Sequence, residues 1–452
     1  MIFSSISFLF LFLPVVFGAY LMLPNIKLKN TWLLLASLFF YAWGEPIYIM
    51  LMLLSTFINW RFGLLIEKKP TLLKYVVIIN LGILFIFKYL NFVISSLNRL
   101  GLELQPTNIS LPIGISFFTF QAMSYVIDVK QGISPSQKSY WNLLLYICLF
   151  PQLIAGPIIK YHDIATQIME RTITTDKIYS GISRFIIGLS KKMIVSNTLA
   201  IYVDTIFSTD IASLNIVSTW IGAFAYVFQI YFDFSGYSDM AIGLGKMFGF
   251  EFKENFNYPL VSTSIKDFWS RWHISLSTWF KEYLYIPLGG NRTGKTYRNL
   301  IIVFLATGIW HGANWTFVLW GIFNGIFLIL ERKKFIHIKS RPLQHVYTFL
   351  VVTLLFVIFR ADNITYAMGY FKTMLLGFDM SRTTGLELIT PFTMFIFVVA
   401  IIGSTPILKF IQNKLSTTIV NIGGYLNTMF LLLINVLFLA SDVYSPFIYF
   451  RF

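Results

Sequence analysis

The stretch Gly308-Ile309-Trp310-His311-Gly312-Ala313-Asn314-Trp315 joins two apolar runs, residues 299–310 and 313–330. Two such runs with so short a polar break predict membrane helices that meet at His311. An ionisable residue at membrane depth is costly unless it faces a cavity or a partner, and is by default a functional-site hypothesis. Desolvation favours the neutral imidazole, which can accept a proton. We interpret His311 as a catalytic base; the alternative is a structural, hydrogen-bonded histidine.

A second histidine, His273, ends the stretch Ser264-Ile265-Lys266-Asp267-Phe268-Trp269-Ser270-Arg271-Trp272-His273. Ser264 with Asp267 three residues later is typical of a capped helix start. Polar residues at steps of three and four then predict a polar stripe on this helix: Lys266, Ser270, His273, Ser277 and Lys281. Aromatic residues on the other faces favour an interfacial helix. His273 is either a second site residue or a histidine that simply faces water.

Composition indicates a membrane protein. Of 452 residues, 56% are hydrophobic and 12% are charged, whereas soluble domains carry about 25% charged residues. Apolar runs of spanning length recur along the chain and predict an all-α polytopic fold. The net charge of +15 comes from basic residues in short loops, which is the pattern of cytoplasmic loops and argues against nucleic-acid binding. A single domain over residues 1–452 is the simplest account.

Charge and helix breaks predict the topology. Basic loops near Lys27, at residues 67–69 and at residues 331–341 are expected in the cytoplasm, with the N-terminus outside. Proline in Gly44-Glu45-Pro46 should separate two helices within residues 31–66. Glycine and proline also interrupt apolar runs, as at residues 151–157. Broken backbone at membrane depth is tolerated where it lines a cavity, so we expect a cavity inside the protein.

The segment Gly289-Gly290-Asn291-Arg292-Thr293-Gly294-Lys295-Thr296 matches a phosphate-binding loop pattern. That motif needs a buried strand before it and a soluble helix after it, and neither is expected here, so nucleotide hydrolysis is disfavoured. Arg292, Lys295 and Arg298 are candidates for contact with the phosphates of a coenzyme donor. The alternative is an ordinary basic cytoplasmic loop.

Other reactive groups carry weaker signals. Cys148 is the single cysteine, so neither a disulfide within the chain nor a Cys–His metal site is expected. Asp233 and Asp239 lie six residues apart and do not share a helical face, which disfavours a two-carboxylate acid–base pair. We expect them to orient neighbouring groups, or to hold a helix break at Gly236.

Several motifs together resemble the membrane-bound O-acyltransferase (MBOAT) family, in particular its alginate-O-acetyltransferase-like bacterial branch. The motifs lie at residues 36–44, 112–117, 150–157, 232–240, 257–292 and 309–321. The resemblance implies a ring of about 11 transmembrane helices, with re-entrant and interfacial helices, around a central tunnel. The Trp-His-Gly motif of the family falls on His311, and its Arg-Trp-His motif falls on His273. Supporting roles are expected within the motifs for Asn257, Asp267, Trp310 and Asn314.

The resemblance also implies an activity. We expect a multi-pass enzyme of the bacterial plasma membrane that transfers an acyl group, acetyl by preference, from acetyl-CoA or an acyl-carrier thioester to hydroxyls of an exported or cell-wall polysaccharide. His311 would act as the base and His273 would orient the donor or acceptor. The donor is a substrate, and no bound cofactor or metal is expected. An extracytoplasmic SGNH-like protein is the expected partner. Alternatives are D-alanyl transfer from a carrier protein to teichoic acid and, in another class, a transporter.

The final residues, Phe447-Ile448-Tyr449-Phe450-Arg451-Phe452, resemble the C-terminal motif of a small membrane protein that accompanies the D-alanylating branch. The tyrosine of that motif is thought to relay the acyl group, which makes Tyr449 a candidate relay. A phenol has a pKa near 10, below that of an alcohol, so a neutral histidine deprotonates it more readily. The alternative is an aromatic anchor at the membrane interface.

Overall fold

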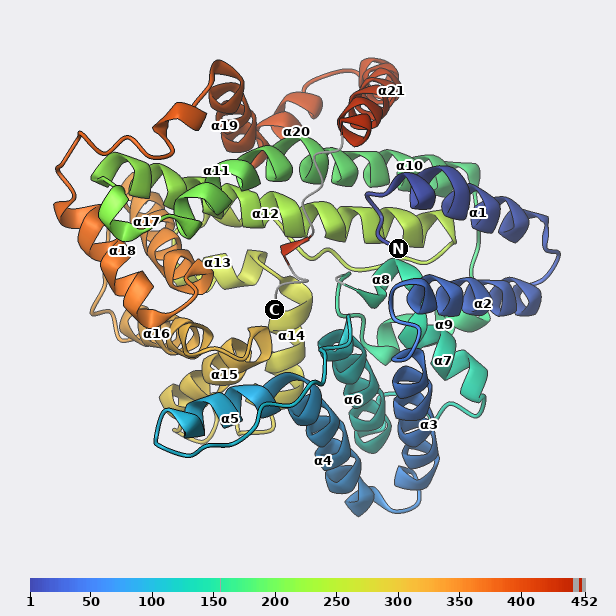
Figure 1. Cartoon of the computed structure of the whole chain (residues 1–452). Helices are drawn as coiled ribbons and strands as arrows, with labels where there is room; N and C mark the ends of the chain where they lie inside the picture. Colours follow the sequence, from blue (N-terminus) through green and yellow to red (C-terminus); the bar gives the residue numbers. More distant parts are fainter. Residues whose placement is uncertain (155, 442–446, 449–452) are drawn as a thin grey trace. The chain divides into compact units, whose positions relative to one another are not determined.

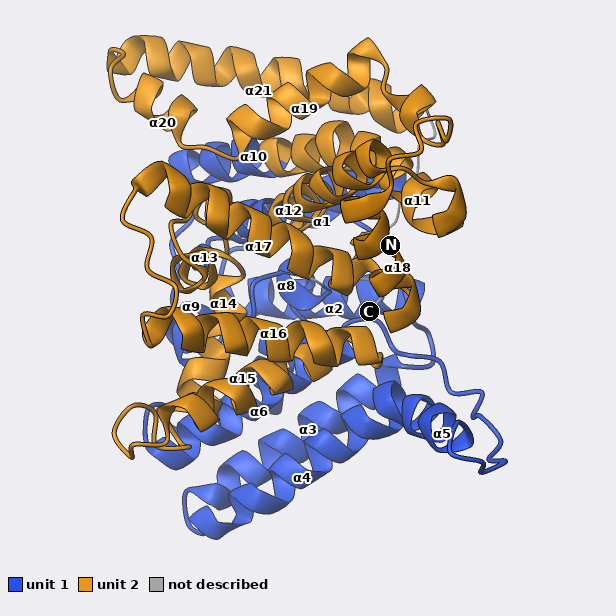
Figure 2. Ribbon diagram, turned by 90° about the vertical axis from the view of Figure 1, so that its left-hand side faces the viewer, with its two compact units in different colours: residues 1–185, 238–254 blue, residues 186–237, 255–452 orange. Residues whose placement is uncertain are grey.

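The computed structural model describes residues 1–154, 156–441 and 447–448, and this part of the chain is helical and contains no strand. The prediction of an all-α fold is confirmed. The chain forms two compact units: residues 1–185 with 238–254 (unit 1), and residues 186–237 with 255–452 (unit 2) (Figure 2). Helices α10 (Thr175–Ser190) and α12 (Ile216–Met247) each run along the chain from one unit into the other. The single domain over residues 1–452 stays a prediction.

Unit 1 contains the helices that follow the N-terminus. They are the π-helical turn Phe8–Phe12, α1 (Leu13–Met22), α2 (Ile26–Gly44), α3 (Ile49–Ile66), the 3-10 turn Pro70–Leu72, α4 (Leu73–Leu84), the π-helical turn Phe85–Tyr89, α5 (Leu90–Asn98), α6 (Ile115–Gln131), α7 (Tyr140–Cys148), α8 (Phe150–Leu153) and α9 (Tyr161–Met169). The break predicted at residues 44–46 is confirmed, since α2 ends at Gly44. Asn25 caps α2 by accepting a hydrogen bond from the Leu28 amide at 2.9 Å.

A buried pair of side-chain amides links α3 and α4 in unit 1. Asn59 of α3 and Asn80 of α4 exchange amide hydrogen bonds of 3.0 and 2.9 Å, and both side chains are buried. Such amide pairs hold neighbouring helices together where water is excluded.

Unit 2 carries both histidine motifs. Its further elements are the π-helical segment Lys191–Ser196, α11 (Asn197–Ser208), the 3-10 turns Ile211–Ser213, Pro259–Val261 and Leu386–Leu388, α13 (Ile265–Arg271), α14 (Ile274–Phe280), the π-helical turn Lys281–Tyr285, α15 (Thr296–His311), α16 (Trp315–Arg332), α17 (Arg341–Arg360), α18 (Ile364–Leu376), α19 (Pro391–Gly403), α20 (Ile407–Gln412) and α21 (Thr417–Ala440). Helix α13 packs against both α16 and α17. Helices α15 and α16 lie side by side (Figure 1).

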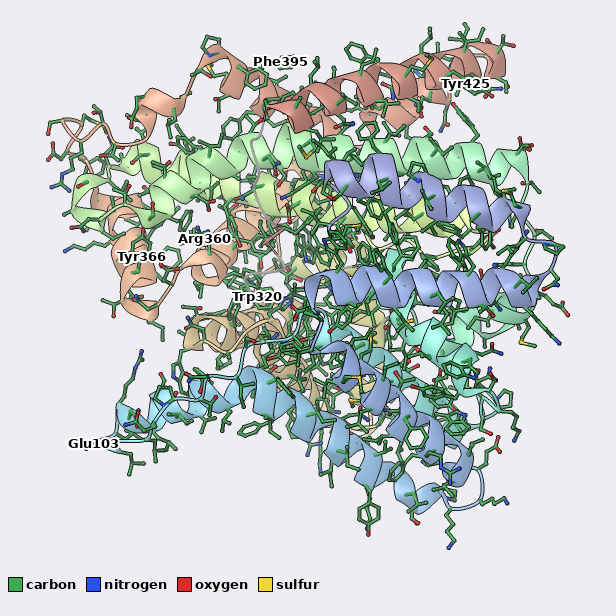
Figure 3. All side chains as sticks on the ribbon, turned by 45° about the vertical axis from the view of Figure 1, so that its right-hand side comes forward. Glu103, Trp320, Arg360, Tyr366, Phe395 and Tyr425 are labelled. Carbon is green, nitrogen blue, oxygen red and sulfur yellow. The ribbon has the colours of Figure 1, made fainter. Side chains whose placement is uncertain are left out.

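Six helical stretches among the described residues are long and apolar enough to cross a membrane. They are Ile49–Ile66, Pro70–Asn98, Thr175–Ser208, Trp315–Arg332, Arg341–Arg360 and Thr417–Ala440. Phe395 on α19 and Tyr425 on α21 are exposed, whereas Trp320 of α16 is buried (Figure 3). Exposed aromatic and aliphatic side chains on apolar helices suit contact with lipid. The ring of about 11 transmembrane helices around a tunnel stays a prediction.

Glycines set how closely α15 and α16 approach each other. A Cβ atom added to Gly308 would lie 2.3 Å from the carbonyl oxygen of Phe317, and one added to Gly321 would lie 2.3 Å from that of Phe304. The two helices therefore touch backbone to backbone, as small residues allow in membrane proteins. This contact fixes the position of the end of α15, where His311 lies.

The helix break expected at Gly236 is wrong. Helix α12 runs without interruption from Ile216 to Met247. A Cβ atom at Gly236 would lie 2.7 Å from the carbonyl oxygen of Gly188. This glycine therefore allows two helices to pack closely and does not end one.

Candidate active site

His311 is the last residue of α15, and only 6% of the residue is exposed. Aromatic rings enclose its imidazole edge-on: the ring centroids of Trp310, Trp320 and Phe359 lie 5.1, 5.1 and 5.2 Å away. His311 also lines a cavity of about 20 Å³, which can hold about one water molecule. Other residues that line this cavity include Asp233, Phe234, Trp272 and Ile448. The histidine singled out from the sequence therefore borders an enclosed space with aromatic walls.

The long helix expected from Ser264 to Lys281 is interrupted at His273. Its start is as predicted, because Ser264 accepts a hydrogen bond from the Asp267 amide at 3.0 Å. Helix α13 then ends at Arg271, and His273 takes the left-handed conformation, with φ at +43°, before α14 begins. The predicted polar stripe is therefore wrong, because the turn rotates everything that follows it. His273 is fully buried, so the alternative that it faces water is also wrong.

Asn255 fixes the orientation of His273. Its side-chain Oδ1 lies 3.2 Å from His273 Nδ1 and accepts hydrogen bonds from the amide and hydroxyl of Ser275 at 3.1 and 2.8 Å. The Asn255 carbonyl accepts a hydrogen bond from the Ile274 amide at 2.9 Å. Burial, together with the nearby His311, holds the pKa of His273 well below its ordinary value. Its imidazole is therefore neutral near pH 7.

Trp310 lies between the two histidines. The centroid of its ring system is 6.1 Å from the imidazole of His273 and 5.1 Å from that of His311. Two histidines that are 38 positions apart in the sequence (311 minus 273) are thus brought to the same aromatic cluster. The fold brings together the two side chains that the sequence motifs indicated.

The other predicted supporting residues brace loops around this cluster. Asn314 caps α16 by accepting from the Thr316 amide at 3.1 Å, and its Nδ2 donates to the Asp362 carbonyl at 2.8 Å. Asp267 accepts a hydrogen bond from Arg271 Nε at 2.8 Å. The Asn257 amide donates to the Arg271 carbonyl at 3.0 Å. None of these three is among the residues that line the cavity of His311.

A second pocket, of about 240 Å³, lies at the N-terminal end of α16, where Asn314, Thr316 and Phe317 line it. We call it the outer pocket. It shares Phe359 and Ile448 with the cavity of His311. Two of its buried polar atoms, Gln229 Oε1 and Thr316 Oγ1, have no hydrogen-bond partner among the residues that the structure describes. Buried polar groups are normally paired, so these atoms are available to a ligand. Arg360, also in this pocket, pairs with Asp204 at 2.9 Å.

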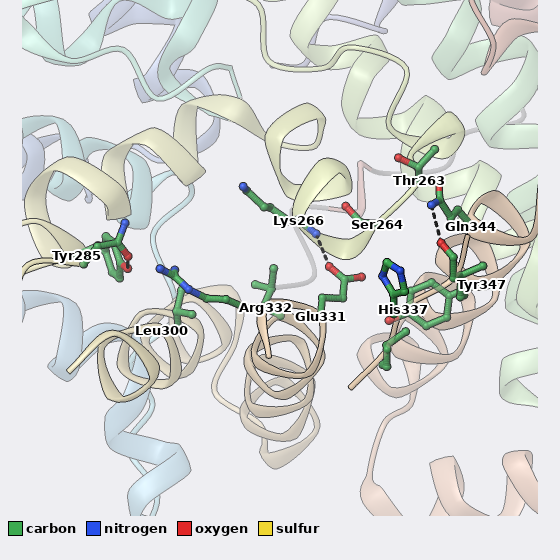
Figure 4. Close-up of a pocket in the computed structure, with 14 residues that line it drawn as sticks. Thr263, Ser264, Lys266, Tyr285, Leu300, Glu331, Arg332, His337, Gln344 and Tyr347 are labelled. Carbon is green, nitrogen blue, oxygen red and sulfur yellow. Dashed lines mark hydrogen bonds between the residues drawn. The ribbon is translucent and has the colours of Figure 1, made fainter. Parts of the chain in front are cut away.

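A larger basin of about 740 Å³ lies at the C-terminal end of α16 (Figure 4). Lys266, Arg332 and His337 bring basic groups to its wall. Glu331 is held there by hydrogen bonds from the amides of Ile265 and Lys266, at 2.7 and 3.2 Å. Thr316 in the outer pocket and Glu331 in the basin are 15 residues apart (331 minus 316), or about 22 Å along the axis of α16. One helix therefore carries a pocket at each end.

The chain matches the model of the membrane-bound O-acyltransferase family over residues 89–366. The chain belongs to the MBOAT family. It is 45% identical to the "Probable alginate O-acetylase AlgI" of Pseudomonas aeruginosa, over 83% of this chain and 75% of that protein. It is 39% identical to the protein of the same name in Pseudomonas putida, over the whole of both chains. The "Peptidoglycan O-acetyltransferase" of Helicobacter pylori is 37% identical, over 83% of this chain and 80% of that protein.

This MBOAT protein is therefore an O-acyltransferase and a multi-pass membrane protein of bacteria. Family membership excludes the transporter alternative.

Three further predicted residues of this acyltransferase stand apart from the basin. Asn291 lines the basin, but Arg292, Lys295 and Arg298 are not among its lining residues. The guanidinium group of Arg298 donates to Asn299 Oδ1 at 3.3 and 3.1 Å. Their contact with a donor stays a prediction.

The tail residue Tyr449 lies outside the described residues, and its neighbour in the sequence, Ile448, lines the cavity of His311. Sequence reasoning missed Asn255. The only available signal was its position two residues before the motif that begins at Asn257, at a place where no periodicity marks it. No group of three or more potential metal ligands occurs within residues 1–154, 156–441 and 447–448.

Proposed function

We propose that this acyltransferase moves an acetyl group from a thioester donor on the cytoplasmic side, acetyl-CoA by preference, to a hydroxyl of an exported or cell-wall polysaccharide, with His311 as general base. The observation that carries the proposal is the burial of His311 beside a cavity that shares two lining residues with an outer pocket. The names of the relatives, a probable alginate O-acetylase and a peptidoglycan O-acetyltransferase, favour acetyl as the group and a polysaccharide as the acceptor.

The chemical step needs one base and no redox partner. A hydroxyl oxygen attacks the carbonyl carbon of the thioester while the neutral imidazole of His311 accepts the hydroxyl proton. The C–O bond of the ester forms, the C–S bond breaks, and the imidazolium returns its proton to the departing thiolate. Thioester and alcohol thus give ester and thiol. A positioned general base contributes about 10²–10⁴-fold to such a reaction.

His273 has a different part in this proposal. It is neutral and is held by Asn255, so it is suited to orient a substrate by hydrogen bonding and less suited to carry charge. Asn255 Nδ2 is buried without a hydrogen-bond partner in the described part of the chain. This amide is a donor left over for a bound substrate, beside the histidine that it positions.

The donor side is proposed to be the basin at the C-terminal end of α16. Residues 331–341 are the densest basic segment of the chain, which favours a cytoplasmic position for this end. A coenzyme would then place its phosphates near Lys266 and Arg332, and its acyl arm would cover the distance of about 22 Å along α16 toward His311. The loop cations Arg292, Lys295 and Arg298 are the competing phosphate contacts.

Charge removal separates the two sets of cations. Loss of a phosphate contact that is equal in ground and transition states should raise the donor KM and leave kcat unchanged. We expect this for Lys266→Gln with Arg332→Gln if the basin binds the phosphates, and for the triple Gln variant of Arg292, Lys295 and Arg298 if the loop does. A donor KM equal to that of the wild type excludes whichever set shows it.

The acceptor side is proposed to be the outer pocket, from which an acyl group would pass to a polysaccharide with the help of an extracytoplasmic SGNH-like partner. Tyr449 is proposed as the intermediate acyl carrier. Its phenol oxygen would take the acetyl group from the thioester and release it to a hydroxyl of the partner or polymer. Tyr449→Phe should then abolish transfer to polymer, and labelled donor should acylate the wild-type C-terminal peptide. Full polymer acylation by the Phe variant would exclude the relay.

The decisive experiment is complementation of a strain that lacks this chain, with the O-acyl content of its polysaccharide measured by NMR. His311→Ala should reduce the ester content by about 10²–10⁴-fold at equal membrane expression. His162→Gln in unit 1 is the matched control and should restore acylation. Acylation by His311→Ala at the wild-type level would reject the base.

Chemical release of the acyl group from the polysaccharide identifies the group, and a separate assay with membrane vesicles tests the direction of transfer. Acetate released by mild base supports acetyl transfer, whereas released D-alanine supports the teichoic acid alternative. Inside-out membrane vesicles should consume added acetyl-CoA, because their cytoplasmic face is outward. Equal consumption by sealed right-side-out vesicles would contradict a cytoplasmic donor site.

A further inference from the structure

A buried ion pair lies in unit 2 next to the cavity of His311. Lys192, from the π-helical segment Lys191–Ser196, pairs with the carboxylate of Asp233 in α12. Their side chains are 1% and 3% exposed. Ser196 Oγ also donates to Asp233 Oδ1, at 3.2 Å. Charges at membrane depth are expensive, and apolar residues of the same size would often be at least as stable there. Stability alone therefore does not explain why this ion pair is buried here.

The second oxygen of Asp233 holds the chain near its C-terminal end. The backbone amide of Ile448 donates to Asp233 Oδ2 at 2.9 Å, across 215 positions in the sequence. The ring of Phe447 lies over Lys192, with Nζ 4.6 Å from the ring centroid. The same ring packs edge-on against Tyr237, with centroids 4.9 Å apart. Both charges of the pair thus contact residues 447–448, one by a hydrogen bond and one through an aromatic face.

The contact has a consequence for the cavity. Asp233 and Ile448 are both part of the wall around His311. Ile448 also belongs to the wall of the outer pocket. Ile448 is therefore part of the partition between the proposed base and the pocket through which an acceptor would come.

We propose that the Lys192–Asp233 pair is a latch that seats segment 447–448 in the wall of the cavity, and that both residues are positioning residues for acyl transfer. The two oxygens of Asp233 make different contacts. One faces Lys192 and Ser196, and the other accepts the hydrogen bond of the Ile448 amide. The lysine keeps the carboxylate charged and in place, and the carboxylate holds the segment. The contacts alone support the seating of segment 447–448, whereas the effect on acyl transfer rests on the proposed function.

Cysteine accessibility tests the seating without any assay of activity. The background is Cys148→Ser, which removes the single, buried cysteine. Ile448→Cys then reports on the segment through its rate of reaction with N-ethylmaleimide in detergent. In the double variant Lys192→Met with Asp233→Leu, both charges are removed together, so that no unpaired buried charge remains to unfold the protein. We expect labelling at position 448 to become at least about tenfold faster in this variant.

Two controls make the result specific. Ser441→Cys, at an exposed position, should react at the same rate with and without the pair. Lys192→Met with Asp233→Asn removes the charges but keeps an amide oxygen that can accept the Ile448 hydrogen bond, so labelling at 448 should stay slow. Equal labelling at 448 in the Met/Leu variant and in the intact pair, with both proteins folded, overturns the latch.

Transfer kinetics test the second half of the proposal. The Met/Leu variant should lose kcat while the donor KM is unchanged, because segment 447–448 is displaced and donor contacts remain. The Met/Asn variant should recover most of kcat. Faster labelling at 448 with full kcat would show that the latch does not position anything for the reaction. If the wild type transfers no acyl group at all, the proposed function fails, and the labelling rates still decide the latch.

Discussion

Substitution of Gly308 by alanine should misplace His311 by an amount that the structure defines. The added Cβ atom would lie 2.3 Å from the carbonyl oxygen of Phe317, where an ordinary carbon–oxygen contact needs about 3.3 Å. The obstacle is backbone, so α15 and α16 must separate by about 1 Å at this point, the difference between the two distances. His311 is at the end of α15 and Trp320 is on α16, so the base moves relative to its own wall.

The cost in stability should be small, and the cost in rate should be large. Overpacking costs about 1–3 kcal/mol, and replacing glycine by alanine within a helix returns about 0.5–1 kcal/mol. The net loss of about 0–2.5 kcal/mol leaves the protein folded. A misplacement of 1 Å can cost about 10²-fold in rate. We therefore expect Gly308→Ala to lower kcat about 100-fold, with a nearly unchanged donor KM, in initial-rate assays in proteoliposomes.

Gly423→Ala in α21 is the matched control, because nothing lies within 4 Å of a Cβ atom there. Its kcat should equal that of the wild type, and its Tm should be equal or slightly higher. Wild-type kcat and Tm in Gly308→Ala would refute the reasoning, since the backbone contact would then not determine the position of His311.

Three further predictions concern other side chains. The hydrogen bond from His162 to Asp128, at 2.8 Å, raises the pKa of His162. The contribution of this hydrogen bond to the free energy of unfolding is fully present below the unfolded pKa of about 6.5. It is lost as pH rises through the raised pKa of the folded state. Tm measured in detergent from pH 5.5 to about 8.5 should fall more steeply for the wild type than for His162→Gln. His273→Asn should keep the fold, because asparagine tolerates the left-handed conformation, but should lower kcat at least about tenfold; unchanged kcat would remove His273 from the site. Trp269→Phe deletes the donor to Asn324 Oδ1 at 3.0 Å and should cost about 1–3 kcal/mol, measured as a lower Tm, because a buried amide oxygen is left unpaired.

Local signals in the sequence predicted local structure well. The apolar runs indicated a helical membrane protein, proline 46 indicated the break after α2, and Ser264 indicated the start of α13. Each of these features depends on residues within one or two turns of each other, so composition and spacing are enough to find them. His311 was singled out in the same way, because an ionisable residue among apolar neighbours is conspicuous in any sequence, and its role as the base stays a prediction.

The predictions that failed concern features that depend on contacts between residues far apart in the sequence. His273 takes a left-handed conformation, which is uncommon for residues other than glycine, because Phe268 and Trp272 on its N-terminal side pack into the core and Asn255 holds its ring. Glycine 236 looked like a break because its packing partner, Gly188, lies 48 positions away in the sequence (236 minus 188). The periodicity of one helix therefore does not reveal either contact.

The close contact of α15 with α16 also bears on how the protein is made. Only residues 312–314 connect these helices, and closing so short a loop costs little chain entropy. Contacts that are local in sequence form early, before long-range pairing has been achieved. Trp310, His311 and Trp320 can therefore come together within a single helical hairpin, while Asn255, Asp233 and Ile448 must be recruited from elsewhere in the chain. The proposed base thus belongs to the fastest-forming part of unit 2. Asn255, which orients His273, and Asp233 and Ile448, which complete the cavity, join a helical hairpin that already exists.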